Sequence, residues 1–161
     1  MPRELDAFRL PMLVVGATVV LTACAQAQTR TVQYINPPAI AKPPGYTHVV
    51  EVSGPVRTVY IAGQLGYDGA GKQGADFREQ ATLVYENLKA AVESVGGKME
   101  NIVKLNAFLT DIRTQLPIYR EVRDKYVNVA APPASTTLEI SKLAREGALI
   151  EVEAVAVLPA R

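Results

Sequence analysis

The chain has 161 residues, a length typical of one globular domain with a modest core. Its 17 Lys and Arg residues nearly balance 16 Asp and Glu residues, and the formal net charge of +1 argues against a nucleic-acid binder, which normally carries a basic surface. A single Cys excludes internal disulfides and paired-cysteine motifs, and a single His excludes sites with several His ligands, so we predict no metal site.

Residues 1–23 have the pattern of a signal peptide. A polar stretch, residues 1–9, precedes an uninterrupted apolar run over residues 10–23, which is shorter than the roughly 20 residues that a membrane-spanning helix needs. An N-terminal core helix is the alternative, but the run has no polar face, which a surface helix of a small domain would show. We therefore predict that the protein is exported.

The end of this apolar run bears on how the protein is processed. Leu21-Thr22-Ala23-Cys24 resembles the bacterial lipobox, in which signal peptidase II cuts before a Cys whose thiol is lipidated. Ala25-Gln26-Ala27 offers a signal peptidase I site instead. The predictions are lipidation at Cys24 and a location in the periplasm or on a bacterial membrane, to which only that lipid would attach the protein.

Strands are predicted next along the chain. Residues 24–44 predict a tether with an edge strand around residues 32–35, because two Pro pairs exclude a central strand. Residues 46–52 and 56–62 are rich in β-branched and aromatic side chains, and the turn signal Ser53-Gly54-Pro55 between them predicts a hairpin.

A Gly-rich loop over residues 63–72 follows, and it lacks the ending of a phosphate-binding loop. Asp76 and Glu79 then form a capping-box pattern that opens an amphipathic helix, which Gly96-Gly97 closes. The hydrophobic periodicity of the remaining chain predicts, in order, a strand, a second helix and two strands over residues 103–110, 115–127, 134–143 and 149–158.

This order of elements indicates an α+β domain over residues 45–161, in which two helices cover one face of a mixed sheet. Several strands carry apolar residues on both faces, as Phe108 and Leu109 do. Because a second apolar face needs cover, the sequence also predicts a homo-oligomer.

Six short motifs lie between residues 31 and 158. They are YINPPA before GYTH, then IAGQ, ENLKAA, IVK and IEVEAVA, at residues 34–39 and 45–48, 61–64, 86–91, 102–104 and 150–156. Together they resemble the RidA/YjgF family of reactive-intermediate deaminases. The resemblance implies a chorismate-mutase-like fold, a homotrimer with ligand sites between subunits, and hydrolysis of small enamines and imines to a 2-keto acid and ammonia without a metal or cofactor.

The resemblance also implies site residues. Glu151 matches the Glu that activates the attacking water, and the positions that would contact the substrate are Tyr46, Gly63, Tyr119, Ser135 and Thr137. Two of these depart from the family pattern, since Ser135 stands at the position of an Arg that grips the substrate carboxylate and Tyr119 at that of a polar Asn. Loss of the Arg would weaken carboxylate binding by about 1.5–3 kcal/mol.

Two functions follow from these residues. The first is a hydrolase of small imines or carbonyl-amine compounds with weakened 2-imino-acid activity, whose substrate lacks the carboxylate or holds it through another cation. The second is a non-catalytic trimer that binds a small molecule in the periplasm. Without the resemblance, Glu151 and Glu153 would be interpreted as a solvated acidic edge, and Tyr46 and Tyr119 as packing aromatics.

Overall fold

The structure is a computed structural model that describes residues 30–161. The signal peptide predicted for residues 1–23 and the lipidation predicted at Cys24 lie outside the described residues. Within the described part, no helix combines the length and the apolar character that crossing a membrane requires.

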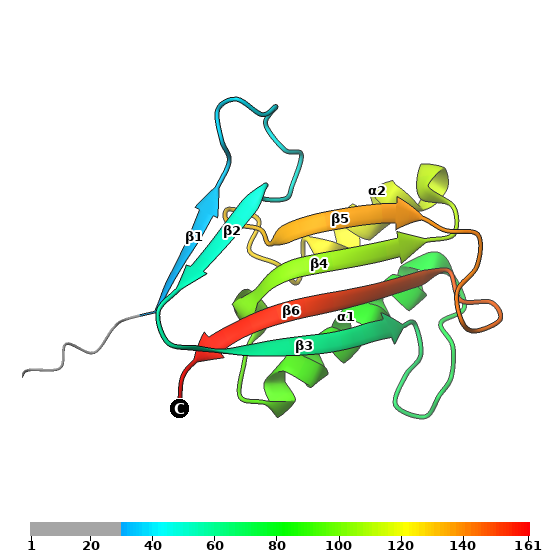
Figure 1. The fold of residues 1–161 in the computed structure, drawn as a ribbon. Helices are drawn as coiled ribbons and strands as arrows, with labels where there is room; N and C mark the ends of the chain where they lie inside the picture. The colour runs from blue at the N-terminus through cyan, green and yellow to red at the C-terminus, as the bar shows by residue number, and fades with distance from the viewer. Residues whose placement is uncertain (1–29) are drawn as a thin grey trace, which may run out of the picture.

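A four-stranded mixed sheet forms the centre of the fold, with the strand order β3-β6-β4-β5 (Figure 1). Only the β4–β5 pair is parallel. The strands are β3 (Val56–Leu65), β4 (Ile102–Leu109), β5 (Ala134–Glu139) and β6 (Ile150–Pro159). Figure 1 shows both α-helices, α1 (Phe77–Ser94) and α2 (Ile112–Arg123), behind this sheet, so one face is covered and the other is open. The predicted α+β architecture with two helices on one face is confirmed.

The core lies between the sheet and α1. Alternate residues of β6 are buried on the helix side, and Ile150, Val152 and Ala156 are fully inaccessible. Helix α1 supplies the facing apolar stripe, as its spacing predicted. It begins where Asp76 accepts a hydrogen bond from the Glu79 amide at 2.8 Å, and a 3-10 turn, Met99–Asn101, leads from it to β4. The cap therefore fixes where helix α1 begins, and the apolar periodicity determines which face of α1 packs on the sheet.

The hairpin predicted for residues 46–52 and 56–62 is wrong. Strand β2 (Val49–Ser53) pairs with β1 (Thr31–Ile35) in a separate two-stranded sheet, whereas β3 pairs with β6. The chain turns at Gly54, which has a φ of 84°. Each five-residue strand thus has a partner of equal length, and the ten-residue β3 has the ten-residue β6. The edge strand predicted around residues 32–35 is confirmed as β1.

Other boundaries also differ from the predictions. Helix α2 begins at Ile112, three residues before the predicted start, because the Asp111 side chain caps it by accepting from the Thr114 amide. Pro117 is consequently inside the helix rather than in its first turn, so one helical hydrogen bond is missing there. Strand β5 ends at Glu139, whose carboxylate accepts a hydrogen bond from the Ile112 amide at 2.8 Å.

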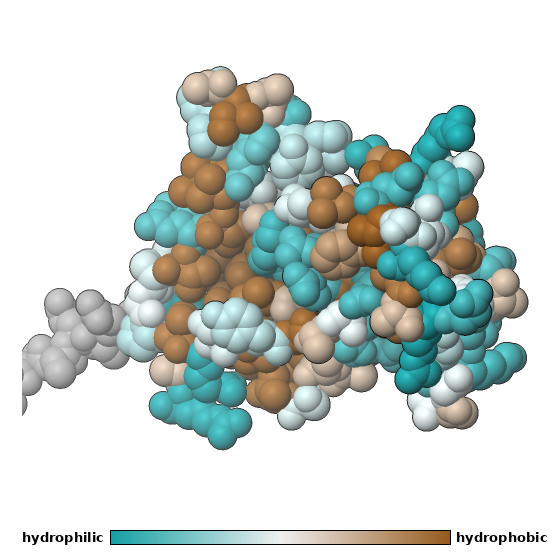
Figure 2. All heavy atoms as spheres, turned by 45° about the vertical axis from the view of Figure 1, so that its right-hand side comes forward, coloured by the Kyte–Doolittle hydropathy of each residue, from teal (hydrophilic) through white to brown (hydrophobic). Residues whose placement is uncertain are grey.

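The first described residue is fixed to the main sheet. Arg30 donates a hydrogen bond from Nη1 to the carbonyl of Val157 in β6 at 2.8 Å. The adjacent β1–β2 sheet carries apolar surface, which Figure 2 shows as brown atoms on the left of the molecule. Val49 of β2 is 44% exposed there, and Ile40 of the β1–β2 connection is 49% exposed.

Candidate functional site

A pocket of about 270 Å³ lies between α2 and the outer edge of β5, and we call it the α2 pocket. Of the predicted site residues, Tyr46, Ser135 and Thr137 line it, together with Arg120 and Arg123. The pocket therefore brings three predicted substrate-binding residues together and adds two arginines that were not predicted.

The segment before β2 places Tyr46 at this pocket. Its neighbour Thr47 is 2% exposed and forms a parallel bridge with Ala134, at the start of β5. The Thr47 amide donates to the Pro133 carbonyl at 3.3 Å, and its hydroxyl donates to the Pro132 carbonyl at 2.6 Å. These bonds extend the edge of the sheet by one short segment and fix Tyr46 beside β5.

Strand register determines where Ser135 and Thr137 point. They lie beside Leu105 and Ala107 of β4, which are fully buried on the helix side of the sheet. Ser135 and Thr137 therefore face α2 rather than the open face. The Ser135 hydroxyl is buried and has no hydrogen-bond partner among residues 30–161.

Arg123 lies at the back of the α2 pocket and is only 6% exposed. Its Nε and Nη2 both donate to Asp124 Oδ1, at 2.9 and 2.7 Å, and its guanidinium carbon lies 5.9 Å from the centre of the Tyr119 ring. Gly45 allows the chain to pass close by, since a Cβ there would lie 2.7 Å from Nη2. The sequence does contain a signal for this cluster, because Leu116, Arg120 and Arg123 recur at one-turn spacing and so share a helix face.

Tyr119 lies beneath the pocket and does not line it. Its side chain is fully buried, and the Tyr85 hydroxyl donates to the Tyr119 hydroxyl at 3.2 Å. Burial raises the pKa of Tyr119, although the hydrogen bond from Tyr85 and the charge of Arg123 oppose the rise. The Ser135 hydroxyl lies near enough to lower this pKa, but not in hydrogen-bond geometry. The substrate contact predicted for Tyr119 would thus be indirect, through Arg123.

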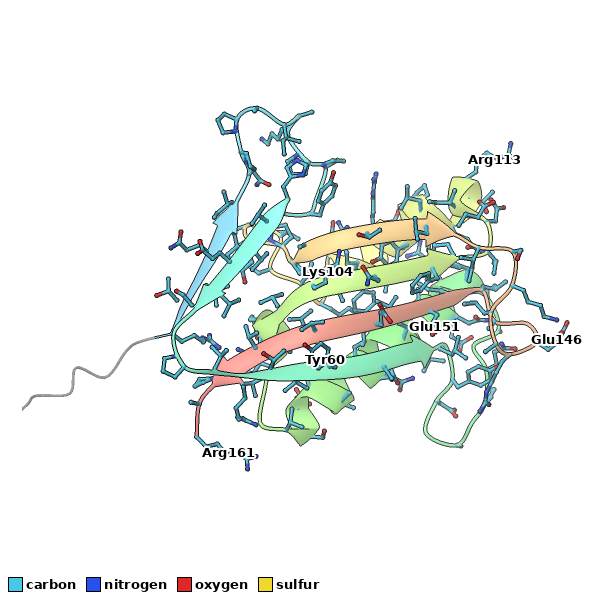
Figure 3. The ribbon with its side chains drawn as sticks, viewed as in Figure 1. Tyr60, Lys104, Arg113, Glu146, Glu151 and Arg161 are labelled. Atoms are coloured by element: carbon cyan, nitrogen blue, oxygen red, sulfur yellow. The ribbon has the colours of Figure 1, made fainter. Side chains whose placement is uncertain are left out.

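Glu151 and Gly63 lie elsewhere, on the open face of the sheet. Figure 3 shows the Glu151 side chain on β6, on the face away from both helices. The pairing of β3 with β6 shifts register between Ile61 and Gln64, which places Gly63 in a bulge opposite this carboxylate. A Cβ at Gly63 would lie 2.7 Å from Glu151 Cδ, so only glycine lets the side chain lie against the backbone there.

The two glutamates of β6 have different surroundings. Glu153 accepts a hydrogen bond from Asn106 Nδ2 at 2.7 Å. The Glu151 carboxylate is half-buried and accepts no hydrogen bond from any residue in the described range. Glu151 is therefore the carboxylate on this face that is available to hold a water or a ligand.

The predicted site residues thus form two groups in one chain. Tyr46, Ser135 and Thr137 lie on the helix side of the sheet, whereas Glu151 and Gly63 lie on its open face. Within residues 30–161, no three His, Cys, Asp or Glu side chains come together in a way that could hold a metal ion.

Comparison with known proteins identifies the family. The sequence model of the endoribonuclease L-PSP family matches residues 37–158. The chain belongs to the RidA/YjgF family. Among RidA-family relatives, a RutC family protein of Aquifex aeolicus is 34% identical over 125 residues, which cover 76% of this chain and 97% of that protein.

Two further comparisons concern activity and fold. The 2-iminobutanoate/2-iminopropanoate deaminase of Dermatophagoides farinae is 29% identical over 127 residues, which cover 77% of this chain and 94% of that protein. The crystal structure of RidA from the Antarctic bacterium Psychrobacter sp. superposes with a TM-score of 0.60 at 32% identity, over 73% of this chain and 92% of that one. The RidA-family membership and the mixed-sheet fold expected from the sequence motifs are confirmed.

Proposed function

We propose that this RidA-family protein hydrolyses small imines or enamines in clefts between the subunits of a homotrimer, with Glu151 as the catalytic residue. The observation that carries the proposal is the Glu151 carboxylate, which lies against the Gly63 backbone on the open face and accepts no hydrogen bond from residues 30–161. The deaminase relative, 29% identical, supports this class of reaction.

The chemistry needs one carboxylate that can move a proton. Glu151 accepts a proton from water as the water oxygen bonds to the imine carbon, and it passes that proton to the nitrogen, which receives the C=N electron pair. Glu151 then takes the proton of the new hydroxyl as the C–N bond breaks. The nitrogen leaves with this proton as ammonia, and a carbonyl compound remains.

Apart from Gly63, which lies beside Glu151, the substrate-binding residues of the proposal come from the next subunit. Tyr46, Ser135 and Thr137 line the α2 pocket, which opens on the other side of the sheet from Glu151, so two copies are needed to bring the groups together. Ser135 is proposed to replace the family Arg, and weakened activity on 2-imino acids is the expected consequence. Tyr119, which lies beneath the α2 pocket, is proposed to support the residues that line it.

The activity assay is release of ammonia and keto acid from freshly generated 2-iminopropanoate, with a neutral imine in parallel. We expect hydrolysis faster than in buffer for at least one of them. A rate equal to that in buffer for both would contradict the proposal. It would leave the second candidate, a non-catalytic trimer that binds a small molecule in the periplasm, which Ser135 at the position of the family Arg favours.

The proposed trimer rests on the open face of the sheet. Tyr60 of β3 is 82% exposed and Leu138 of β5 is 49% exposed, and both lie on this face beside Val155 and Phe108. Large apolar side chains of this kind mark surfaces that another chain covers. A trimer of like subunits would bury the open faces against one another.

Tyr60→Glu tests the trimer, because it would place three carboxylates at the buried centre. We expect light scattering to give three times the chain mass for the parent and a smaller mass for the variant. Val129→Glu, at a residue that is 63% exposed outside the sheet, is the matched control and should leave the mass unchanged. A monomeric parent, or a trimeric Tyr60→Glu, would count against this arrangement.

Export and lipidation at Cys24 are proposed from the sequence pattern of residues 1–24. Metabolic labelling with a fatty acid in a bacterial host should label the parent, and Cys24→Ser should abolish the label. Labelling that persists in Cys24→Ser, or an unlabelled parent, would reject lipidation.

The ribonuclease activity named in the description of the family model is not part of the proposal. With 17 basic and 16 acidic residues, the chain has a surplus of only one positive charge with which to bind a phosphate backbone. No cofactor and no nucleic-acid partner are proposed.

A further inference from the structure

The α2 pocket contains a buried cation whose hydrogen-bonding capacity is only partly used. Arg123 is 6% exposed, and burial of a charge is costly unless the charge is paired. Asp124 Oδ1 occupies the edge formed by Nε and Nη2. The remaining nitrogen, Nη1, donates no hydrogen bond to any residue between 30 and 161, so its two N–H groups are available to a ligand.

Arg120 adds a second cation at the mouth of the same pocket. It lies three residues before Arg123 on α2, it is exposed, and it forms no ion pair with the described part of the chain. No carboxylate is among the residues that line the pocket. Asp124 pairs with Arg123, and the Glu139 carboxylate accepts a hydrogen bond from the amide of Ile112. Arg120 therefore keeps a positive charge that no ion pair with the described residues neutralises.

Hydroxyl groups complete the wall opposite the arginines. Ser135 and Thr137 line the pocket from β5, and the buried Ser135 hydroxyl lacks a hydrogen-bond partner among residues 30–161. An unsatisfied buried hydroxyl destabilises the free pocket, and rotation toward a bound acceptor would restore the missing hydrogen bond. The pocket volume of about 270 Å³ is just below the usual range of ligand pockets, so only a small molecule would fit.

We propose that Arg120 and Arg123 form an anion clamp in the α2 pocket, which binds the carboxylate of a small organic acid with Ser135 as an additional donor. A guanidinium group presents paired N–H donors in the plane of a carboxylate, whereas a lone hydroxyl cannot hold a charge in this way. The inference rests on the proposed function in one respect, namely that the bound acid is the substrate. The substrate would then be an acid whose carboxylate is bound by Arg120 and Arg123 of α2, instead of by an Arg at the position of Ser135 on β5.

The test is a direct binding measurement on the whole chain without turnover. Isothermal titration calorimetry with 2-oxobutanoate, its neutral methyl ester and inorganic phosphate separates three kinds of ligand. We expect the acid to bind at least tenfold more tightly than the ester and more tightly than phosphate. Equal affinity for acid and ester, or binding of phosphate alone, would overturn the proposal.

Variants assign the binding to α2. Arg120→Gln and Arg123→Lys should each weaken binding of the acid by about tenfold to a hundredfold, as expected for loss of a hydrogen bond between charged groups. Ser135→Ala should weaken it several-fold. Arg113→Gln, on an exposed arginine of the same helix, is the matched control and should bind as the parent does. If Arg123→Lys does not fold, the affinities of Arg120→Gln and Ser135→Ala for the acid decide whether the anion clamp exists.

The outcome also separates this inference from the proposed hydrolase. A chain that binds 2-oxobutanoate through Arg120 but hydrolyses no imine would support the anion clamp and contradict the hydrolase. A chain that hydrolyses 2-iminopropanoate with unchanged KM in Arg120→Gln and Arg123→Lys would support the hydrolase and reject the anion clamp.

Discussion

Glu151→Gln is expected to lower the rate of imine hydrolysis by about 10²–10⁴-fold, the usual contribution of a positioned acid or base. The amide keeps the size and shape of the side chain but can no longer accept a proton from water. The loss should appear in kcat, because the water rather than the substrate loses its partner. The measurement is steady-state release of ammonia from 2-iminopropanoate or from whichever imine the parent hydrolyses.

Glu153→Gln is the matched control for this change. Glu153 is two residues away on the same strand face, but its carboxylate is bonded to Asn106 at 2.7 Å. We expect Glu153→Gln to retain the parent's rate within a few-fold. Equal losses in both variants would indicate a general effect of charge on the open face, and an unchanged rate in Glu151→Gln would remove Glu151 from the mechanism.

Substitution of alanine at two glycines near the end of β3 is expected to have different effects, on stability at Gly66 and on activity at Gly63. At Gly66, a Cβ would lie 2.5 Å from the backbone Cα of Gln80, which cannot move without shifting α1. Gln80 is itself buried, and it bonds the carbonyls of Gly74 and Gly147 and the amide of Leu149. Gly66→Ala should therefore lower the free energy of unfolding by about 1–3 kcal/mol, the cost of overpacking a core.

At Gly63 the added methyl group would meet the side chain of Glu151, which can rotate away. Gly63→Ala should thus leave the free energy of unfolding nearly unchanged and lower the rate of hydrolysis, since the carboxylate would be displaced from its place beside the backbone. Urea denaturation and the ammonia assay on both variants give the comparison. A Gly63→Ala chain with full activity would show that the position of Glu151 against this backbone is not required.

The parts of the fold that could be predicted depend on local pattern. Helix α1 has a cap at Asp76 and a regular apolar stripe, and the first half of strand β6 alternates between apolar and acidic residues, so both were predicted to within two residues. Strand pairing is not local. The turn at Ser53-Gly54-Pro55 is compatible with a hairpin and with a change of sheet, and the choice depends on β1 and β6, which lie far away in sequence.

Only those residues of the candidate site that lie in or next to a recognisable motif could be predicted from the sequence. Glu151 and Gly63 lie in motifs that carry the family resemblance, and the structure places them together. Arg123 lies in none of these motifs, and a charged residue on a helix is normally assigned to solvent. The one-turn spacing of Arg120 and Arg123 shows that they share a helix face, but the burial of Arg123 depends on Asp124, Tyr119 and Gly45 acting together, which that spacing does not show.

The hydrogen bond from Arg30 to the Val157 carbonyl has a consequence for engineering the chain. It brings residue 30, just before β1, to the end of β6, so residue 30 and the C-terminal residues lie at the same end of the main sheet (Figure 1). A short peptide could therefore join residue 30 to the C-terminus, and new termini could be opened in an exposed loop such as that around Gly69 and Gly71. Such a circular permutant would retain every strand pair of the sheet.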